Sequence, residues 1–237
     1  METQLYFWRP LIEMQKKQLS SIIEYYKRTV VAFKDVEEEA EKYADTFYKK
    51  FPASEDDDPA TIAEQAYDKS LEKYETLCIM KLNHLLMTIA MLYQVWEQQL
   101  IKFTMIEMSN YLSFEKALDY KEVQIIFKLH GVDIIKTCSW NKIRELKFLV
   151  NTVKHGEGIS ADKLRKIRPD FFELDEIEGA DTLKFHKAVL LDSYSLQVKE
   201  DDLYAYFEAT KSFWDEMPER AYSDTNTITT ALNEAGE

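Results

Sequence analysis

Apolar residues recur at intervals of three and four along most of the chain before Gly131. This spacing places apolar side chains on one face of an α-helix. Glycine and proline interrupt helices, yet Gly131 is the first of only five glycines, and just Pro10, Pro52 and Pro59 precede it. The pattern therefore predicts a few long helices in this part of the chain.

The first long helix is predicted over residues 8–51. That segment has no glycine, and its one proline, Pro10, suits the first turn of a helix. Pro52, an acidic run and Pro59 then predict a solvated loop. Asp58, at the end of this loop, is placed to cap the following helix.

The second long helix is predicted from 60 to 109. Its middle is apolar on most faces, as expected of the central helix of a bundle. The most apolar run, 85–96, is too short to cross a bilayer, so we expect it to be buried in protein, with no membrane as a partner.

Shorter helices are predicted next. Ser113 suits an N-cap, and Gly131 after His130 suits a left-handed C-cap, so one helix is predicted between them. Another is predicted over about 133–155, closed by Gly156.

The remaining chain predicts smaller elements. Ser160 is expected to cap a short helix that stops before Pro169. Residues 183–199 combine short β-branched and aromatic runs that fit either a strand or a loop. A last amphipathic helix is predicted over 199–217, and the polar tail 218–237 is expected to be disordered.

Together these elements predict an all-α fold. We expect a helical bundle with two long N-terminal helices and shorter C-terminal helices, in which 183–199 could supply a minor β segment. A core of this size fits a single domain over residues 1–217.

Composition narrows the class of protein. The net charge of −13 argues against a surface that is basic throughout, as many nucleic-acid-binding proteins have. Cys78 and Cys138 lie inside apolar helical patterns and are expected to be reduced core thiols. With no signal-like apolar run near the N-terminus, the expected location is the cytoplasm.

One segment has the opposite charge. Residues 141–168 contain eight basic and three acidic side chains, a net charge of +5, which leaves −18 for the rest. A basic segment in an acidic chain indicates a phosphate-bearing partner, although it also fits a solvated face or an internal partner for acidic surface. The basic residues are Lys142, Arg144, Lys147, Lys154, Lys163, Arg165, Lys166 and Arg168.

A polar stripe is predicted along the helix over about 133–155. At about 100° per residue, Arg144, Asn151 and His155 fall within about 20° of one line along the helix. Asn151 and His155 are four residues apart, so both side chains can touch one ligand. The apolar positions Ile143, Leu146, Val150 and Val153 lie on another face.

The sequence Asn151-x-x-x-His155, with Lys154 before the histidine and Gly156 after it, resembles the signature helix of HEPN-domain proteins. The resemblance implies a helical bundle, a homodimer and metal-independent endoribonuclease activity of the kind found in bacterial toxin–antitoxin and phage-defence systems. An antitoxin or another partner protein is implied as well. The family motif has Arg directly before the asparagine, where this chain has Val150.

The resemblance also implies roles. His155 would be the general acid/base for attack by an RNA 2′-hydroxyl, since imidazole exchanges protons near neutral pH. Asn151 would orient His155 or the scissile phosphate. Arg144, on the same face, is a candidate for the catalytic cation in place of the family arginine. Since 11 residues of helix separate it from His155 by about 16 Å, it would act from a second subunit. The other candidates for binding RNA phosphates are Lys147, Lys154, Arg165 and Arg168.

Ordinary explanations remain open. Histidine followed by glycine is a common helix ending, and asparagine can be structural. The alternative function is therefore a non-catalytic protein-interaction module of the same fold. His84, on the apolar central helix, is expected to be a hydrogen-bonded core histidine. No Gly-rich loop or metal-ligand spacing is present, so no cofactor and no metal are expected.

Overall fold

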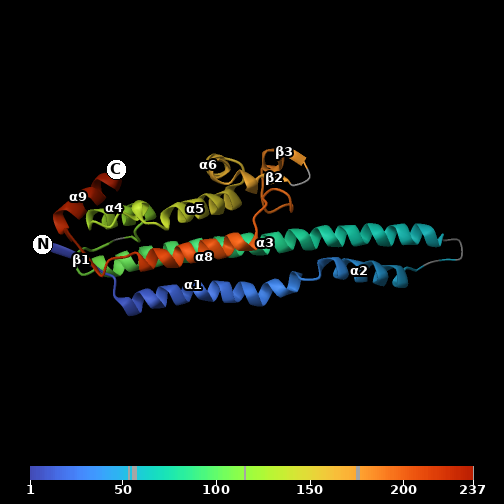
Figure 1. Cartoon of the computed structure of the whole chain (residues 1–237), viewed down its shortest axis with the longest axis horizontal. Coiled ribbons are helices and arrows are strands. Elements are labelled where there is room, and N and C mark those ends of the chain that lie inside the picture. Colours follow the sequence, from blue (N-terminus) through green and yellow to red (C-terminus); the bar gives the residue numbers. More distant parts are fainter. Residues whose placement is uncertain (53, 55–57, 115, 175–176, 237) are drawn as a thin grey trace. The chain divides into compact units, whose positions relative to one another are not determined.

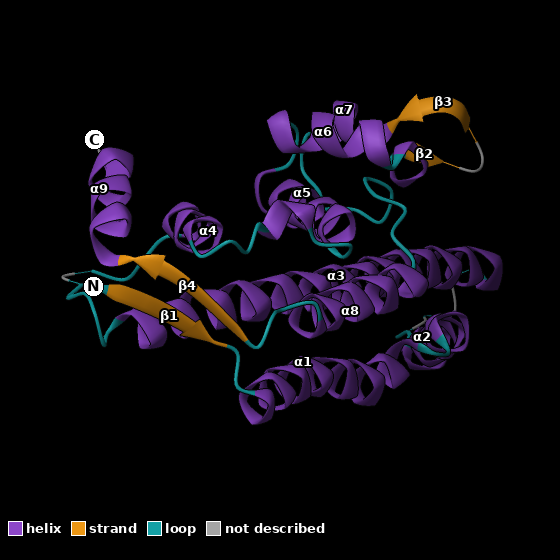
Figure 2. Cartoon of the chain, turned by 60° about the vertical axis from the view of Figure 1, so that its left-hand side comes forward, coloured by secondary structure: helices purple, strands orange, loops and turns teal. Residues whose placement is uncertain are grey.

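The computed structural model describes residues 1–52, 54, 58–114, 116–174 and 177–236, so residues 55–57 of the predicted acidic loop lie outside it. The described chain is mainly helical with two short antiparallel strand pairs, which confirms the all-α prediction (Figures 1 and 2). The elements are β1 (Glu2–Tyr6), α1 (Arg9–Thr29), η1 (Val30–Phe33), α2 (Val36–Lys50), α3 (Pro59–Met108), α4 (Tyr120–Leu129), η2 (Ile134–Lys136), α5 (Trp140–His155), α6 (Ile159–Ile167), η3 (Pro169–Phe171), β2 (Glu173–Leu174), β3 (Ile177–Asp181), α7 (Thr182–His186), α8 (Glu200–Asp215), β4 (Arg220–Asp224) and α9 (Thr225–Gly236).

The chain divides into two compact units. The first unit comprises Met1–Glu24, Thr88–Val150 and Glu200–Glu237, and the second comprises Tyr25–Met87 and Asn151–Lys199. Helices α1, α3 and α5 each contribute residues to both. The single domain expected for residues 1–217 stays a prediction.

Aromatic side chains form the core of the first unit. Phe103 of α3 stacks on Phe7 with ring centroids 4.7 Å apart and meets Trp214 of α8 at 5.9 Å. Trp96, two turns earlier on the same face of α3, meets Phe213 edge-on at 5.1 Å. All five rings are buried, so they contribute much of the apolar burial that holds α3 and α8 together.

Strands β1 and β4 join the two ends of the chain within the first unit. They pair antiparallel with Leu5 opposite Ala221, and α9 follows β4 directly (Figure 2). The expectation that 218–237 is disordered is therefore wrong. Sequence periodicity could not reveal this pairing, because the two short strands are far apart in the chain.

Helix α4 begins later than predicted. Asp119 is its N-cap and forms a capping box with Glu122, so Ser113 is not the cap. The predicted end is confirmed: Gly131 has φ +80°, and the amide of Val132 donates to the Phe127 carbonyl at 2.9 Å. Together with the hydrogen bond from the Gly131 amide to the Lys128 carbonyl at 3.0 Å, this bond forms a Schellman motif.

In the second unit the predicted helix 8–51 is interrupted. Residues 30–33 form a 3₁₀ turn, and α2 starts at Val36 after Asp35. No glycine or proline marks this break, which is why the apolar spacing suggested one continuous helix. By contrast α3 has the predicted bounds to within one residue, and Asp58 accepts a hydrogen bond from the amide of Ala60 at 3.0 Å.

His84 of α3 is a satisfied histidine, as expected. Its Nε2 lies 2.9 Å from the Thr29 hydroxyl, and its ring stacks on Tyr26 with centroids 5.4 Å apart. Burial lowers the pKa of His84.

The rest of the second unit corrects one prediction and decides between the two alternatives left open for residues 183–199. Helix α6 starts after Gly158 with no side-chain cap, so Ser160 is not its N-cap. Residues 183–199 contain the short helix α7 and turns but no strand; the strands β2 and β3 precede this segment.

Two further expectations concern thiols and membranes. Cys78 and Cys138 are free as expected, but Cys138 is exposed and does not belong to the core. Among the described helices, α3 alone is long and apolar enough to cross a membrane by length and composition, a property that it shares with core helices of soluble proteins.

Candidate functional site

Helix α5 carries the predicted stripe. Its N-terminus is capped in the first unit by the Glu216 carboxylate, which accepts hydrogen bonds from the amides of Cys138 and Ser139. On the opposite face from the stripe, the apolar positions Ile143, Leu146, Val150 and Val153 are buried as predicted.

Asn151 and His155 lie at the C-terminal end of α5, in the second unit. Asn151 is half-buried and His155 is exposed. Neither side chain has a hydrogen-bond or ion-pair partner within the part of the chain that the structure describes. Two adjacent polar groups without internal partners can both turn to the same external ligand.

Arg144 does not join them. It is exposed and belongs to the first unit, eleven residues before His155 on the same helix, or about 16 Å by the helix rise. Val150, which occupies the position of the family arginine, is 7% exposed and belongs to the core. The side chain of an arginine at position 150 would therefore project from the buried face of α5.

Gly156 ends α5 and fixes what lies beside His155. Its φ is +70°, and a Cβ on it would overlap the carbonyl oxygen of Lys187. The same oxygen accepts a hydrogen bond from the amide of Glu157 at 3.2 Å. This contact holds the end of α7 against the end of α5, with His186 and Lys187 exposed.

Lys187 and His186 were missed by the sequence analysis. Lys187 has a left-handed backbone with φ +58° at the C-cap of α7. His186 lies 3.8 Å from the Asp192 carboxylate. The only local signal was the glycine at position 156; nothing in the spacing indicates that a loop about thirty residues later packs on it.

Arg165, a predicted phosphate-binding residue, is occupied by carboxylates. Its guanidinium contacts Glu157, Asp162 and Asp181, for example at 2.9 Å from Nη1 to Glu157 Oε1 and 3.0 Å to Asp162 Oδ1. The hydrogen bonds to Glu157 and then to Asp181 raise the pKa of Arg165 above its usual range. This group is a structural ion cluster of the second unit.

The other predicted cations differ among themselves. Arg168 is bonded to Asp170 at 2.9 Å and lies over the Phe171 ring, and Arg168 holds the pKa of the Asp170 carboxyl below its usual range. Lys147, in the first unit, lies over the Tyr120 ring at 4.4 Å. Lys154 is exposed and has no partner among the described residues.

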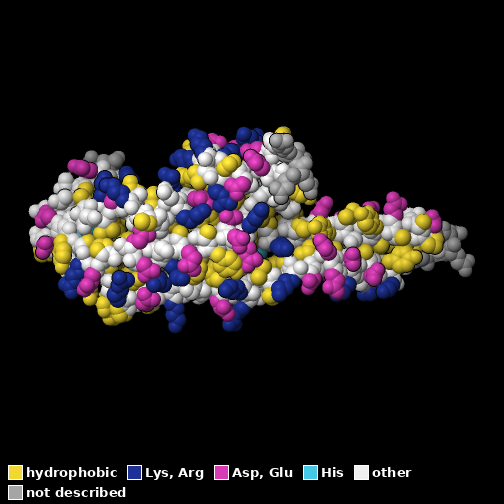
Figure 3. Space-filling model, in the orientation of Figure 1, with side chains coloured by type: hydrophobic (Ala, Val, Ile, Leu, Met, Phe, Trp, Pro, Cys, Tyr) yellow, Lys and Arg dark blue, Asp and Glu magenta, His cyan; other side chains and the backbone are white. Residues whose placement is uncertain are grey.

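The basic segment is consequently less available than its composition suggests. Carboxylates from outside it, Asp170 and Asp181, meet two of its arginines. Figure 3 shows Lys and Arg side chains gathered over α6 with acidic side chains among them. Two exposed cations lie at the end of α5. Lys154 precedes His155 in the chain, and the backbone carbonyl of Lys187 packs on Gly156.

A metal centre is not indicated: within the described residues no group of three or more histidine, cysteine, aspartate or glutamate side chains could hold an ion. No family model matches the chain, and comparisons with curated proteins and with solved structures give no significant match. The class that fold and site define is an all-α helical protein with a half-buried asparagine and an exposed histidine at one helix end.

Proposed function

We propose that the C-terminal end of α5 is an RNA-binding site of a HEPN-like helical protein, and that His155 acts there as general acid/base in metal-independent RNA cleavage. The observation that supports this most is the Asn151–His155 pair, which lies on one helix face and has no internal partner in the described chain. Two exposed cations, Lys154 and Lys187, accompany it.

In this mechanism His155 accepts the proton of an RNA 2′-hydroxyl. The 2′-oxygen attacks the adjacent phosphorus to form a 2′,3′-cyclic phosphate. The bond from phosphorus to the 5′-oxygen breaks, and the leaving 5′-oxygen takes up a proton from the His155 imidazolium to become a hydroxyl. Asn151 donates a hydrogen bond to a phosphate oxygen, and Lys154 with Lys187 offsets the charge that develops on the phosphate. Bacterial defence or a toxin–antitoxin pair is the setting that we propose for such an enzyme, with a homodimer and an antitoxin as partners.

Purified protein incubated with single-stranded RNA, with and without EDTA, tests the proposal. We expect chelator-resistant cleavage that His155→Ala lowers by about 10²-fold or more. Lys154→Gln should weaken RNA binding, whereas Lys121→Gln, an exposed lysine of α4 in the first unit, serves as the matched control. RNA that is neither bound nor cleaved by the wild-type protein would rule out the proposal.

A second function, a non-catalytic protein-interaction module, is supported by a different observation. Val150 is buried where the family has arginine, and Arg165 and Arg168 are bound to carboxylates. RNA binding without cleavage, unchanged by His155→Ala, would favour a binding role. Neither binding nor cleavage would favour the interaction module.

A further inference from the structure

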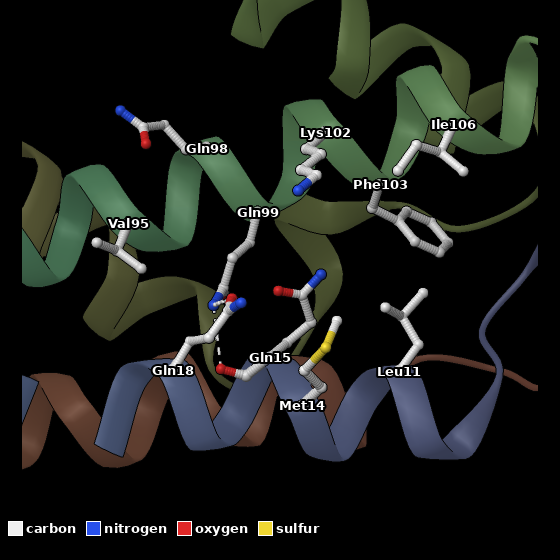
Figure 4. A pocket seen from close by; sticks show the side chains of 10 residues that line it. All are labelled: Leu11, Met14, Gln15, Gln18, Val95, Gln98, Gln99, Lys102, Phe103 and Ile106. Carbon is white, nitrogen blue, oxygen red and sulfur yellow. Dashed lines mark hydrogen bonds between the residues drawn. The ribbon is translucent and has the colours of Figure 1, made fainter. Parts of the chain in front are cut away.

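A groove lies between α1 and α3 within the first unit. It has a volume of about 370 Å³, which is in the range of small-molecule sites. Figure 4 shows its walls: Leu11 and Met14 project from α1, and Phe103 and Lys102 project from α3. No feature of the candidate site on α5 contributes to it.

Gln99 fixes the geometry of one end of the groove. Its side-chain nitrogen donates to the backbone carbonyl of Gln15 at 3.0 Å and to the side-chain oxygen of Gln18 at 3.1 Å. Its side-chain oxygen accepts from Trp214 Nε1 at 3.1 Å. The amide of Gln99 is therefore tied to both α1 and α8 and is not free to meet a ligand.

Gln15 differs from Gln99. The Gln15 residue is 95% buried, but its amide atoms are open to the groove and have no hydrogen-bond partner among the described residues. Figure 4 shows this amide rising from α1 into the groove, toward Lys102 and Phe103. Such an amide offers both a donor and an acceptor to whatever enters the groove. The Gln15 amide therefore marks the place of a ligand edge that offers both.

The surroundings of Gln15 add two constraints on this ligand. Leu11 and Phe103 supply apolar surface, and Met14 is half exposed beside them. Lys102 is the one charged side chain on the described walls; it is exposed and has no partner there. The matching ligand has apolar surface, a donor–acceptor edge and a negative charge.

We propose that the groove binds a nucleotide. The Gln15 amide pairs with the donor–acceptor edge of the base, as glutamine pairs with adenine in nucleic-acid complexes. Leu11 and Met14 cover the base, and Lys102 pairs with the phosphate. The nucleotide is either a free mononucleotide or one unit of an RNA strand. The proposal does not depend on His155, because every lining residue belongs to the first unit.

Titration calorimetry of the full chain with adenosine 5′-monophosphate, adenosine and ribose 5-phosphate tests the site. Gln15→Met keeps the side-chain volume and removes the amide; we expect it to weaken binding of the monophosphate about 10-fold. Lys102→Gln should weaken the monophosphate and leave adenosine unchanged. Gln94→Met and Lys121→Gln, at exposed positions outside the groove, are the matched controls and should bind normally.

A short oligoadenylate distinguishes the two sources of the nucleotide. Binding of the oligomer alone, lost in Gln15→Met, assigns the groove to an RNA strand, and binding of the monophosphate assigns it to a free nucleotide. Absence of binding by both ligands at about 10 mM overturns the proposal. Equal binding by wild type and Gln15→Met, or by the monophosphate and ribose 5-phosphate, overturns it as well. If Gln15→Met does not fold, unchanged monophosphate binding by Lys102→Gln, a surface variant, is still a contradiction.

Discussion

Two helices of this protein end in the same dipeptide, His-Gly, with opposite surroundings. His130 closes α4 and is 4% exposed, with Nδ1 2.7 Å from the Ile126 carbonyl and Nε2 3.0 Å from the Thr3 hydroxyl. His155 closes α5, is exposed, and has no partner in the described chain. The shared dipeptide therefore specifies a helix ending, and only the fold decides whether the imidazole is structural or available.

The glycines that follow these histidines show the opposite order of packing: the one after the buried histidine is open, and the one after the exposed histidine is tightly packed. Gly131 and Gly156 both have left-handed backbones, with φ of +80° and +70°. Open space surrounds the missing side chain of Gly131, whereas that of Gly156 would meet the Lys187 carbonyl oxygen. The exposed His155 thus precedes the tightly packed Gly156, whereas the buried His130 precedes Gly131, which has open space around it.

The largest effect is expected from the glycines. Gly156→Ala combines a left-handed backbone with a backbone clash and should lower the free energy of unfolding by about 3 kcal/mol. Gly131→Ala, the matched control, carries only the backbone cost of about 1 kcal/mol. Urea unfolding followed by circular dichroism measures both. Equal losses would show that Lys187 does not pack on Gly156 as described.

The next effect separates the histidines. His130→Ala removes two hydrogen bonds and a buried ring, and should cost about 2 kcal/mol. His155→Ala should change stability by less than about 0.5 kcal/mol, because the side chain is exposed. The same unfolding experiment decides, and a loss above about 1 kcal/mol in His155→Ala would assign His155 a structural role.

The cations near the end of α5 extend the contrast between occupied and available groups. Arg165 is 14% exposed and bridges three carboxylates, so Arg165→Gln should cost about 2 kcal/mol by leaving those charges unpaired. Lys154→Gln should leave stability within about 0.5 kcal/mol. Chemical denaturation measures stability, and an RNA-binding assay should show the reverse order of effects. A stable Arg165→Gln that no longer binds RNA would instead make Arg165 a ligand residue.

Much of the helical fold could be predicted because it rests on local signals. Pro59 and the apolar spacing place α3 to within one residue, and Gly131 and Gly156 mark two helix ends. The break at 30–35 was missed because no glycine or proline accompanies it. Strands β1 and β4 were missed because their pairing is non-local, and a short polar tail gives no periodic signal of its own.

The candidate site shows the same division. The positions of Asn151, His155 and Val150 on α5 follow from helical periodicity. The occupation of Arg165 depends on Asp181, and the approach of Lys187 depends on the contact at Gly156. Neither could be predicted from spacing, since each joins segments separated by a chain whose path was unknown.

The smallest effect is the pH dependence of the buried histidine. Burial lowers the pKa of His130 in the folded state, so the unfolded chain binds more protons below its ordinary pKa of about 6.5. Stability from this group is therefore present above about pH 6.5 and is lost as pH falls through that value toward the folded pKa. His84 contributes with the same sign, because burial lowers its pKa too.

Unfolding free energies measured from about pH 7.5 to pH 5.5 should accordingly decline for the wild type and decline less for His130→Gln. When His130 is neutral, Nδ1 donates to the Ile126 carbonyl, so Nε2 must accept from Thr3, whose hydroxyl also lies 3.1 Å from the Ser223 carbonyl. Protonation lets Nε2 donate instead and frees the Thr3 hydroxyl for Ser223, which partly compensates for the buried charge. A flat wild-type profile, or a decline in His130→Gln equal to that of the wild type, would contradict the prediction.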